Sequence, residues 1–195
     1  GPAEALLHKW VEHAKGQIFI GGHEPKDLLS LFYSTAELYK NLYGVDTIVR
    51  ITSDCPLVDP ALIDACIAVQ QATNAPYVTT LYGYPEGTDT EVFTMAALHT
   101  IYTAADTNDK GREHVTWGMR DRTRFACCYL SGDGELSVRP HQWSIDTPAD
   151  LDHVRRIYER LPEHWGWQDA LKIEEELKNE QRTETLKMGY SKSTS

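Results

Sequence analysis

The sequence predicts a single α/β domain built around a largely parallel sheet. Short runs rich in β-branched and aromatic residues alternate with segments whose apolar residues recur at helical spacing, which is the pattern of right-handed βαβ units. A length of 195 residues is enough for one well-filled core. We therefore expect one domain over residues 3–195, because Gly1 and Pro2 are typical of a protease-cleavage scar.

The individual elements follow from apolar period and from capping residues. Gly16 and Gly44 are expected to end helices, and Asp59 and Thr147 to cap helices that begin with Pro60 and Pro148. Helices are expected at 6–14, 26–43, 60–71, 95–105, within 109–122, at 148–161 and at 168–179, and strands at 17–20, 47–51, 77–81, 124–130 and 142–145. The turn-rich residues 82–93 are expected to cross the ligand edge of the sheet.

The helix expected at 26–43 has a broad apolar stripe that predicts its buried face. That face is expected to contain Leu28, Leu31, Phe32, Thr35, Leu38, Tyr39 and Leu42.

Composition excludes several classes of function. The formal charge is -10, with 19 Lys and Arg against 29 Asp and Glu, so no nucleic-acid partner is expected, because binding to a phosphate backbone needs clustered cations. No apolar run approaches the ~18 residues of a membrane span, and no signal-peptide pattern opens the chain. The four cysteines have no CxxC spacing, so we expect neither zinc nor disulfides, and a cytoplasmic protein.

Asp54 is the first candidate for a functional side chain. It follows directly after the strand expected at 47–51, and the carboxyl ends of strands in open α/β sheets are where ligands bind. A metal or a polar substrate would suit that position. An aspartate that only caps or closes a turn fits the same spacing.

Asp146 occupies an equivalent place after the strand expected at 142–145. Two carboxylates from separate strands can hold a Mg²⁺ ion that keeps several waters and binds substrate phosphates. Asp54 and Asp146 are therefore predicted to be metal-binding and catalytic, although spacing alone leaves helix capping open for both.

Four further residues could contact a substrate. Asp89 and Glu91 alternate with Thr90 in an extended segment and so face the same side, either toward a ligand or as a solvated strand face. Arg112 and His114 could bind an acidic substrate or could form the surface of a short helix.

Four motifs, taken in order, resemble the cytidylyltransferases of sugar-acid activation. They are RITSDCPLVDP (50–60), YPEGTDTEVF (84–93), REHVT (112–116) and WSIDTPADL (143–151). The sequence is most similar to the spore-coat polysaccharide branch, near the acylneuraminate and KDO cytidylyltransferases, and GYSKS (189–193) resembles that branch's C-terminal signature. The similarity extends from about Leu6 to the end of the chain.

The resemblance implies a three-layer, Rossmann-like nucleotide-diphosphosugar transferase fold. It further implies Mg²⁺ as cofactor, and CTP and a sugar acid as substrates, giving a CMP-linked product and pyrophosphate. Carried over by position, Asp54 and Asp146 become the metal-binding acids. Asp89, Glu91, Arg112 and His114 fall on the side of the acceptor sugar.

The sequence departs from the family pattern at its start. The nucleotide-binding loop of the form ARxxSxRLPxK is missing, and Leu31 stands where the family usually has arginine. An N-terminally truncated fold would leave a gap between the strands expected at 17–20 and 47–51, exposing unpaired backbone groups. We therefore expect a rearranged sheet or a homodimer that completes it.

The missing loop also keeps a second class of function open. The chain could be a non-catalytic protein of the same fold that binds a sugar acid or takes part in assembly. A glycosyltransferase of the related fold is disfavoured, because no DxD run follows a strand.

Overall fold

A computed structural model describes residues 27–81, 83–104, 109–132 and 141–192. The helix and strand predicted at 6–14 and 17–20 lie outside these residues, as does the predicted gap beside that strand. The described elements are α2 (Leu28–Tyr43), β1 (Thr47–Arg50), α3 (Pro60–Thr73), β2 (Tyr77–Thr79), β3 (Glu91–Thr94), α4 (Met95–Thr103), α5 (Asp109–Glu113), the 3-10 helix η1 (Trp117–Arg120), β4 (Cys127–Tyr129), α6 (Pro148–Tyr158) and α7 (Trp167–Lys192).

The described sheet has four strands in the order β1-β3-β2-β4. β2 and β4 pair in parallel, whereas β3 lies between β1 and β2 and is antiparallel to both. The α/β prediction is confirmed, but the sheet is mixed. The end of the segment predicted to cross the ligand edge, from Glu91, forms this central strand. Just before it, the amide of Thr80 donates to the carbonyl of Thr90 at 3.1 Å.

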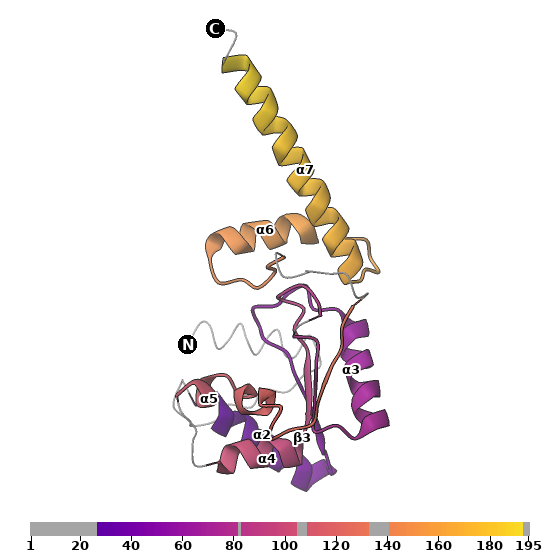
Figure 1. Cartoon of the computed structure of the whole chain (residues 1–195), viewed down its shortest axis with the longest axis vertical. Helices are drawn as coiled ribbons and strands as arrows, with labels where there is room; N and C mark the ends of the chain where they lie inside the picture. The colour runs from indigo at the N-terminus through magenta and orange to yellow at the C-terminus, as the bar shows by residue number, and fades with distance from the viewer. Residues whose placement is uncertain (1–26, 82, 105–108, 133–140, 193–195) are drawn as a thin grey trace.

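Helices cover both faces of this sheet (Figure 1). α3 packs on one face and α2 and α4 on the other, while α6 and the base of α7 sit over the end of the sheet. The rest of α7 projects away from the body. Among the described residues, no helix combines the length and the apolar character needed to cross a bilayer.

Local capping chemistry sets most helix ends as predicted. Asp59 and Thr147 accept hydrogen bonds at the N-termini of α3 and α6, and Thr147 forms a complete capping box with Asp150. Gly44 ends α2 in the left-handed conformation, with φ at 71°. These ends were predictable because each cap involves residues within a few positions of each other.

Three predictions about the elements were wrong. Residues 142–145 form no strand, only an isolated bridge between Glu86 and Gln142. α7 continues past residue 179 to Lys192. α2 buries Leu29 and Ala36, while Leu38 and Leu42 of the predicted inner face are exposed.

An apolar groove runs between α2 and β1, which is one edge of the described sheet. This surface explains why the predicted stripe of α2 is only partly buried, since part of that stripe lines the groove. Its lining residues are Leu31, Phe32, Thr35, Ala36, Tyr39, Val45, Thr47, Ile48 and Val49.

Candidate functional site

The loop after β1 holds Asp54 at the end of the sheet. Its turns are closed by backbone hydrogen bonds from Cys55 to Thr52 and from Val58 to Cys55, both 3.3 Å. The Cys55 thiol is buried, lies 2.9 Å from the Thr52 hydroxyl and donates toward Asp54 Oδ1 at 3.7 Å. Asp54 is half-buried, so its carboxylate has a defined setting that solvent can still reach.

Asp146 is brought to the same place by the segment before it. The amide of Ile145 donates to the carbonyl of Asp54 at 2.9 Å, and the amide of Trp143 donates to the carbonyl of Glu86 at 2.7 Å. Residues 141–145 therefore cross the ends of two loops and deliver the exposed Asp146 beside the Asp54 loop. The contact joins the backbones of the two loops, and a metal ion shared by Asp54 and Asp146 stays a prediction.

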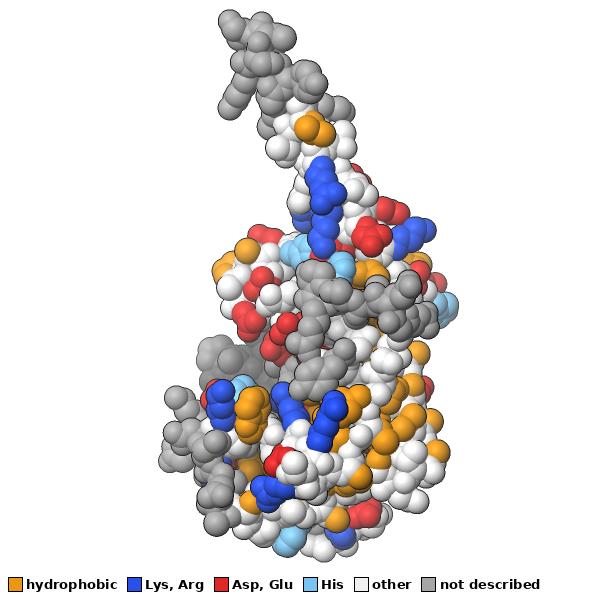
Figure 2. All heavy atoms as spheres, viewed as in Figure 1, with side chains coloured by type: hydrophobic (Ala, Val, Ile, Leu, Met, Phe, Trp, Pro, Cys, Tyr) orange, Lys and Arg blue, Asp and Glu red, His pale blue; other side chains and the backbone are white. Residues whose placement is uncertain are grey.

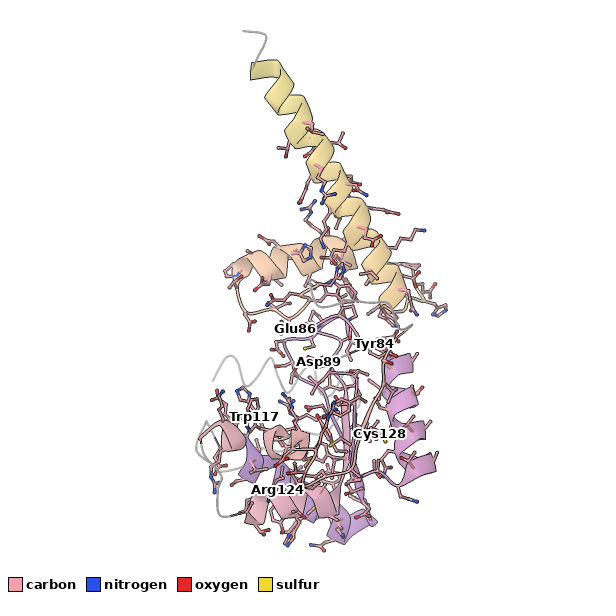
Figure 3. The ribbon with its side chains drawn as sticks, in the orientation of Figure 1. Tyr84, Glu86, Asp89, Trp117, Arg124 and Cys128 are labelled. Carbon is pink, nitrogen blue, oxygen red and sulfur yellow. The ribbon has the colours of Figure 1, made fainter. Side chains whose placement is uncertain are left out.

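Asp89 adds a third carboxylate to the region. Burial, followed by the neighbouring charges of Glu91 and Glu86, raises the pKa of Asp89 to about 6. Burial, together with the charges of Asp54 and Asp89, likewise raises the pKa of the Cys55 thiol to about 12. Both aspartates are close enough to raise the pKa of the same thiol, so they border one acidic region. In Figure 3, Glu86 and Asp89 lie between the sheet and α6.

Glu91 is buried beneath this region and is fully engaged by protein groups. Its Oε2 pairs with Arg50 at 2.6 Å, and its Oε1 accepts from Tyr77, Thr116 and Arg120 at 2.5, 2.6 and 3.3 Å. Burial opposes ionisation, but the guanidinium of Arg50 and the hydroxyl bonds outweigh it and hold the pKa of Glu91 below its usual value. Direct contact of Glu91 with a substrate stays a prediction.

Among the described residues, the side chains of Arg112 and His114 contact Asp27, Ser30 and Trp117, and not the candidate acids. Arg112 Nη1 pairs with Asp27 Oδ2 at 2.8 Å and lies 3.2 Å from the Ser30 hydroxyl, and so ties α5 to the N-terminus of α2. His114 is exposed, with its ring tilted against Trp117 at a centroid separation of 6.3 Å. Direct contact of either residue with a substrate stays a prediction.

The structure adds a basic and aromatic patch that the sequence analysis missed. Trp117 is 43% exposed, and Lys110 and Arg120 lie over its ring at 4.9 and 5.7 Å from the centroid. Arg120 also reaches Glu91, and its Nε is buried with no hydrogen-bond partner among the described residues. The only signal in the sequence was the mixture of charges and Trp in 109–122, because side-chain directions in a short 3-10 helix cannot be predicted from spacing.

The two signs of charge are arranged around the same end of the sheet. Figure 2 shows acidic side chains gathered below α6, with Lys and Arg side chains beneath them. A ligand that carries both a bound cation and anionic groups suits such a surface better than a neutral one does.

The donor set fits a magnesium ion better than an all-protein metal site. No group of three or more potential His, Cys, Asp or Glu ligands occurs among the described residues. Two carboxylates are enough for Mg²⁺, which keeps several waters and takes further oxygens from substrate phosphates. Asp54 and Asp146 would hold it.

Comparisons with known proteins agree with this architecture. No protein-family model matches the chain. It is 33% identical over 141 residues to an uncharacterized protein of Methanocaldococcus jannaschii, covering 72% of this chain and 54% of the relative. It is 26% identical over 148 residues to the spore coat polysaccharide biosynthesis protein SpsF of Bacillus subtilis, covering 75% and 59%. The chain thus spans a little over half the length of these curated relatives.

A solved structure is similar over nearly the whole chain. A cytidylyltransferase from Leptospira borgpetersenii superposes with a TM-score of 0.77 at 20% identity, covering 90% of this chain and 73% of the other. The chain therefore has the fold of a cytidylyltransferase, as the four motifs predicted.

Proposed function

We propose that this chain belongs to a nucleotidyltransferase that transfers CMP from CTP to a sugar acid and releases pyrophosphate. The observation that carries the proposal is the 2.9 Å hydrogen bond from Ile145 to Asp54, since it sets the Asp146 loop beside the Asp54 loop at the end of β1. The cytidylyltransferase fold and the similarity to the spore coat protein SpsF support the choice of reaction.

The transfer needs a hydroxyl oxygen of the acceptor to attack the α-phosphorus of CTP. One P–O bond forms while the bond from the α-phosphorus to the oxygen bridging to the β-phosphate breaks. Pyrophosphate leaves with that electron pair, and the proton of the acceptor hydroxyl passes to the departing pyrophosphate or to solvent. The acidic region of Asp54, Asp89 and Asp146 would repel a triphosphate by itself. Mg²⁺, when bound, neutralises charge on the phosphates, and Asp54 and Asp146 are the residues that would hold it.

The remaining polar groups divide the acceptor side into two parts. Asp89 would accept a hydrogen bond from an acceptor hydroxyl. The anionic group of the acceptor would lie toward Trp117, where the cations Lys110 and Arg120 lie over the ring and His114 flanks it. Glu91 and Arg112 would act by holding this frame.

Calorimetry with CTP and Mg²⁺ tests the proposal on the 195-residue chain. We expect binding that requires the metal and that weakens by about tenfold or more in Asp54→Asn and in Asp146→Asn. Even the loss of a residue that only orients a metal ligand lowers metal affinity by ~10-fold. Asp152→Asn is the matched control, since Asp152 is exposed on α6 and pairs only with Arg155 at 3.3 Å among the described residues. Equal affinity in all three variants would contradict the proposed metal ligands.

The alternative is a non-catalytic protein of the same fold that binds a sugar acid or takes part in assembly. It predicts no heat with CTP and Mg²⁺, together with measurable binding of a sugar acid such as N-acetylneuraminate or KDO. Formation of pyrophosphate from CTP in the presence of a sugar acid would reject it.

A further inference from the structure

The base of α7 is bonded to both loops that carry the candidate metal ligands. We infer that Asp59 and Glu174 are positioning residues that use α7 to set Asp54 and Asp146 relative to each other. The inference rests on the proposed function for the roles of Asp54 and Asp146. The contacts that carry it involve two buried carboxylates that the proposed reaction does not use.

Asp59 ties the Asp54 loop to the start of α7. It is 4% exposed, and its Oδ1 accepts the amide of Ala61 at 2.8 Å while its Oδ2 accepts the amide of Trp167 at 2.9 Å. A Cβ added at Gly166 would lie 3.2 Å from Asp59 Oδ2, so the approach of α7 to this loop is close. One carboxylate therefore serves the first turns of two helices.

Glu174 ties the Asp146 segment to α7 two turns further along. It is 2% exposed; its Oε2 contacts His141 Nδ1 and accepts from Trp143 Nε1 at 3.2 Å. Its Oε1 is 3.2 Å from His153 Nε2 of α6 and 2.9 Å from Lys178 Nζ. Burial opposes ionisation, but hydrogen bonds from Lys178 and His141 keep the pKa of Glu174 below its usual value, so the carboxylate is charged and oriented.

These contacts continue directly to the acids. Trp143 donates its indole N–H to Glu174 and its amide to Glu86, and two residues later Ile145 bonds to Asp54. The Trp143 ring also packs in a core cluster with Val154, Ile157 and Ile173. Loss of the Trp143 indole donor would therefore loosen the backbone that places Asp146. Loss of Lys178 leaves Glu174 bound to His141, Trp143 and His153, so the Asp146 segment keeps its contacts to α7.

This difference provides a matched pair of variants on one carboxylate. Trp143→Phe removes the indole donor but keeps an aromatic ring, and Lys178→Met removes the ion pair but keeps the apolar stem. In calorimetry with CTP and Mg²⁺ we expect Glu174→Gln and Trp143→Phe to weaken binding by about tenfold, with Lys178→Met and the exposed Glu176→Gln near wild type. If Glu174 acts only in stability, Glu174→Gln will lower the melting temperature and leave the affinity of the folded protein for CTP and Mg²⁺ unchanged. That result would overturn the inference.

Hydrogen exchange separates this inference from the proposed function. In Glu174→Gln the amides of Trp143 and Ile145 should exchange about tenfold faster, whereas Lys178→Met should leave them unchanged. If the wild type binds no CTP but these amides respond, the proposed function fails and the positioning contact stands. Exchange at both amides that is the same in Glu174→Gln and wild type would overturn the positioning role, whatever the nucleotide does.

Discussion

The amide of Ile145 donates a 2.9 Å hydrogen bond to the carbonyl of Asp54, although the two residues are far apart in the sequence. Through this bond, loops from two parts of the chain present carboxylates at the same end of the sheet. The proposed metal site depends on this relationship, and so do the predictions about it.

A double-mutant cycle tests whether Asp54 and Asp146 act on one ion. If both hold the same Mg²⁺, then Asp54→Asn and Asp146→Asn should each cause most of the loss in affinity for CTP and Mg²⁺, and the double variant should be little worse than either. Calorimetry of the four proteins gives the coupling free energy. Losses that simply add would indicate two separate interactions.

Asp89→Asn should change stability only where Asp89 is ionised. Its pKa is raised from 3.8 to about 6 in the folded protein, so ionisation is harder there than in the unfolded chain, and the resulting penalty grows from about pH 4 and is full above pH 6. We expect Asp89→Asn to stabilise the protein by roughly 1 to 3 kcal/mol at pH 7.5 and much less at pH 4.

Urea unfolding at the two pH values measures this difference. Asp64→Asn, an exposed aspartate on α3, is the control. Equal effects of Asp89→Asn at both values would contradict the raised pKa.

Glu91→Gln should be strongly destabilising. The buried carboxylate is paired with Arg50 and Arg120, and its removal leaves two half-buried cations without their partner, which costs about 3 kcal/mol. Because the pKa of Glu91 is lowered from 4.5, its contribution is complete above about pH 4.5 and is lost as the pH falls through the lowered folded pKa. Urea unfolding at pH 7 measures the loss of unfolding free energy in Glu91→Gln. Glu175→Gln, a change at an exposed residue of α7, is the control. A loss below about 1 kcal/mol in Glu91→Gln would contradict this role.

Arg112→Met should affect stability and leave substrate affinity almost unchanged. Arg112 pairs with Asp27 at 2.8 Å, with the two side chains 38% and 23% exposed, so we expect a coupling of about 0.5 to 1 kcal/mol in a cycle with Asp27→Asn. Asn remains a good N-cap for α2. Additive stability losses, combined with weaker binding of a sugar acid in Arg112→Met, would instead favour direct contact of Arg112 with the acceptor.

Local chemistry made much of the fold predictable. The ends of α2, α3 and α6 follow from Gly44, Asp59 and Thr147, because each cap involves neighbouring residues. The strands at 47–50 and 77–79 lie within their predicted ranges. The fold also followed from four ordered motifs.

The positions of several predicted residues could not be predicted in the same way. Leu38 and Leu42 of α2 have apolar spacing yet are exposed, since the face a helix buries depends on what packs against it. Contact of Glu91 with a substrate stays a prediction, and the protein partners of Glu91 come from β1, β2 and η1. Nothing near Glu91 in the sequence indicates that two arginines converge on it.

The sequence by itself determined the helix caps, the alternation of strands and helices, and the two acids that follow strands or strand-like segments. The tertiary structure decided that β3 runs antiparallel through the middle of the sheet, that residues 141–145 cross two loops without forming a strand, and that α7 bonds both acid loops through Asp59 and Glu174. The physical reason is range. Caps and periodicity are interactions between near neighbours, whereas strand order and the partners of a buried carboxylate depend on which distant segments exclude water together.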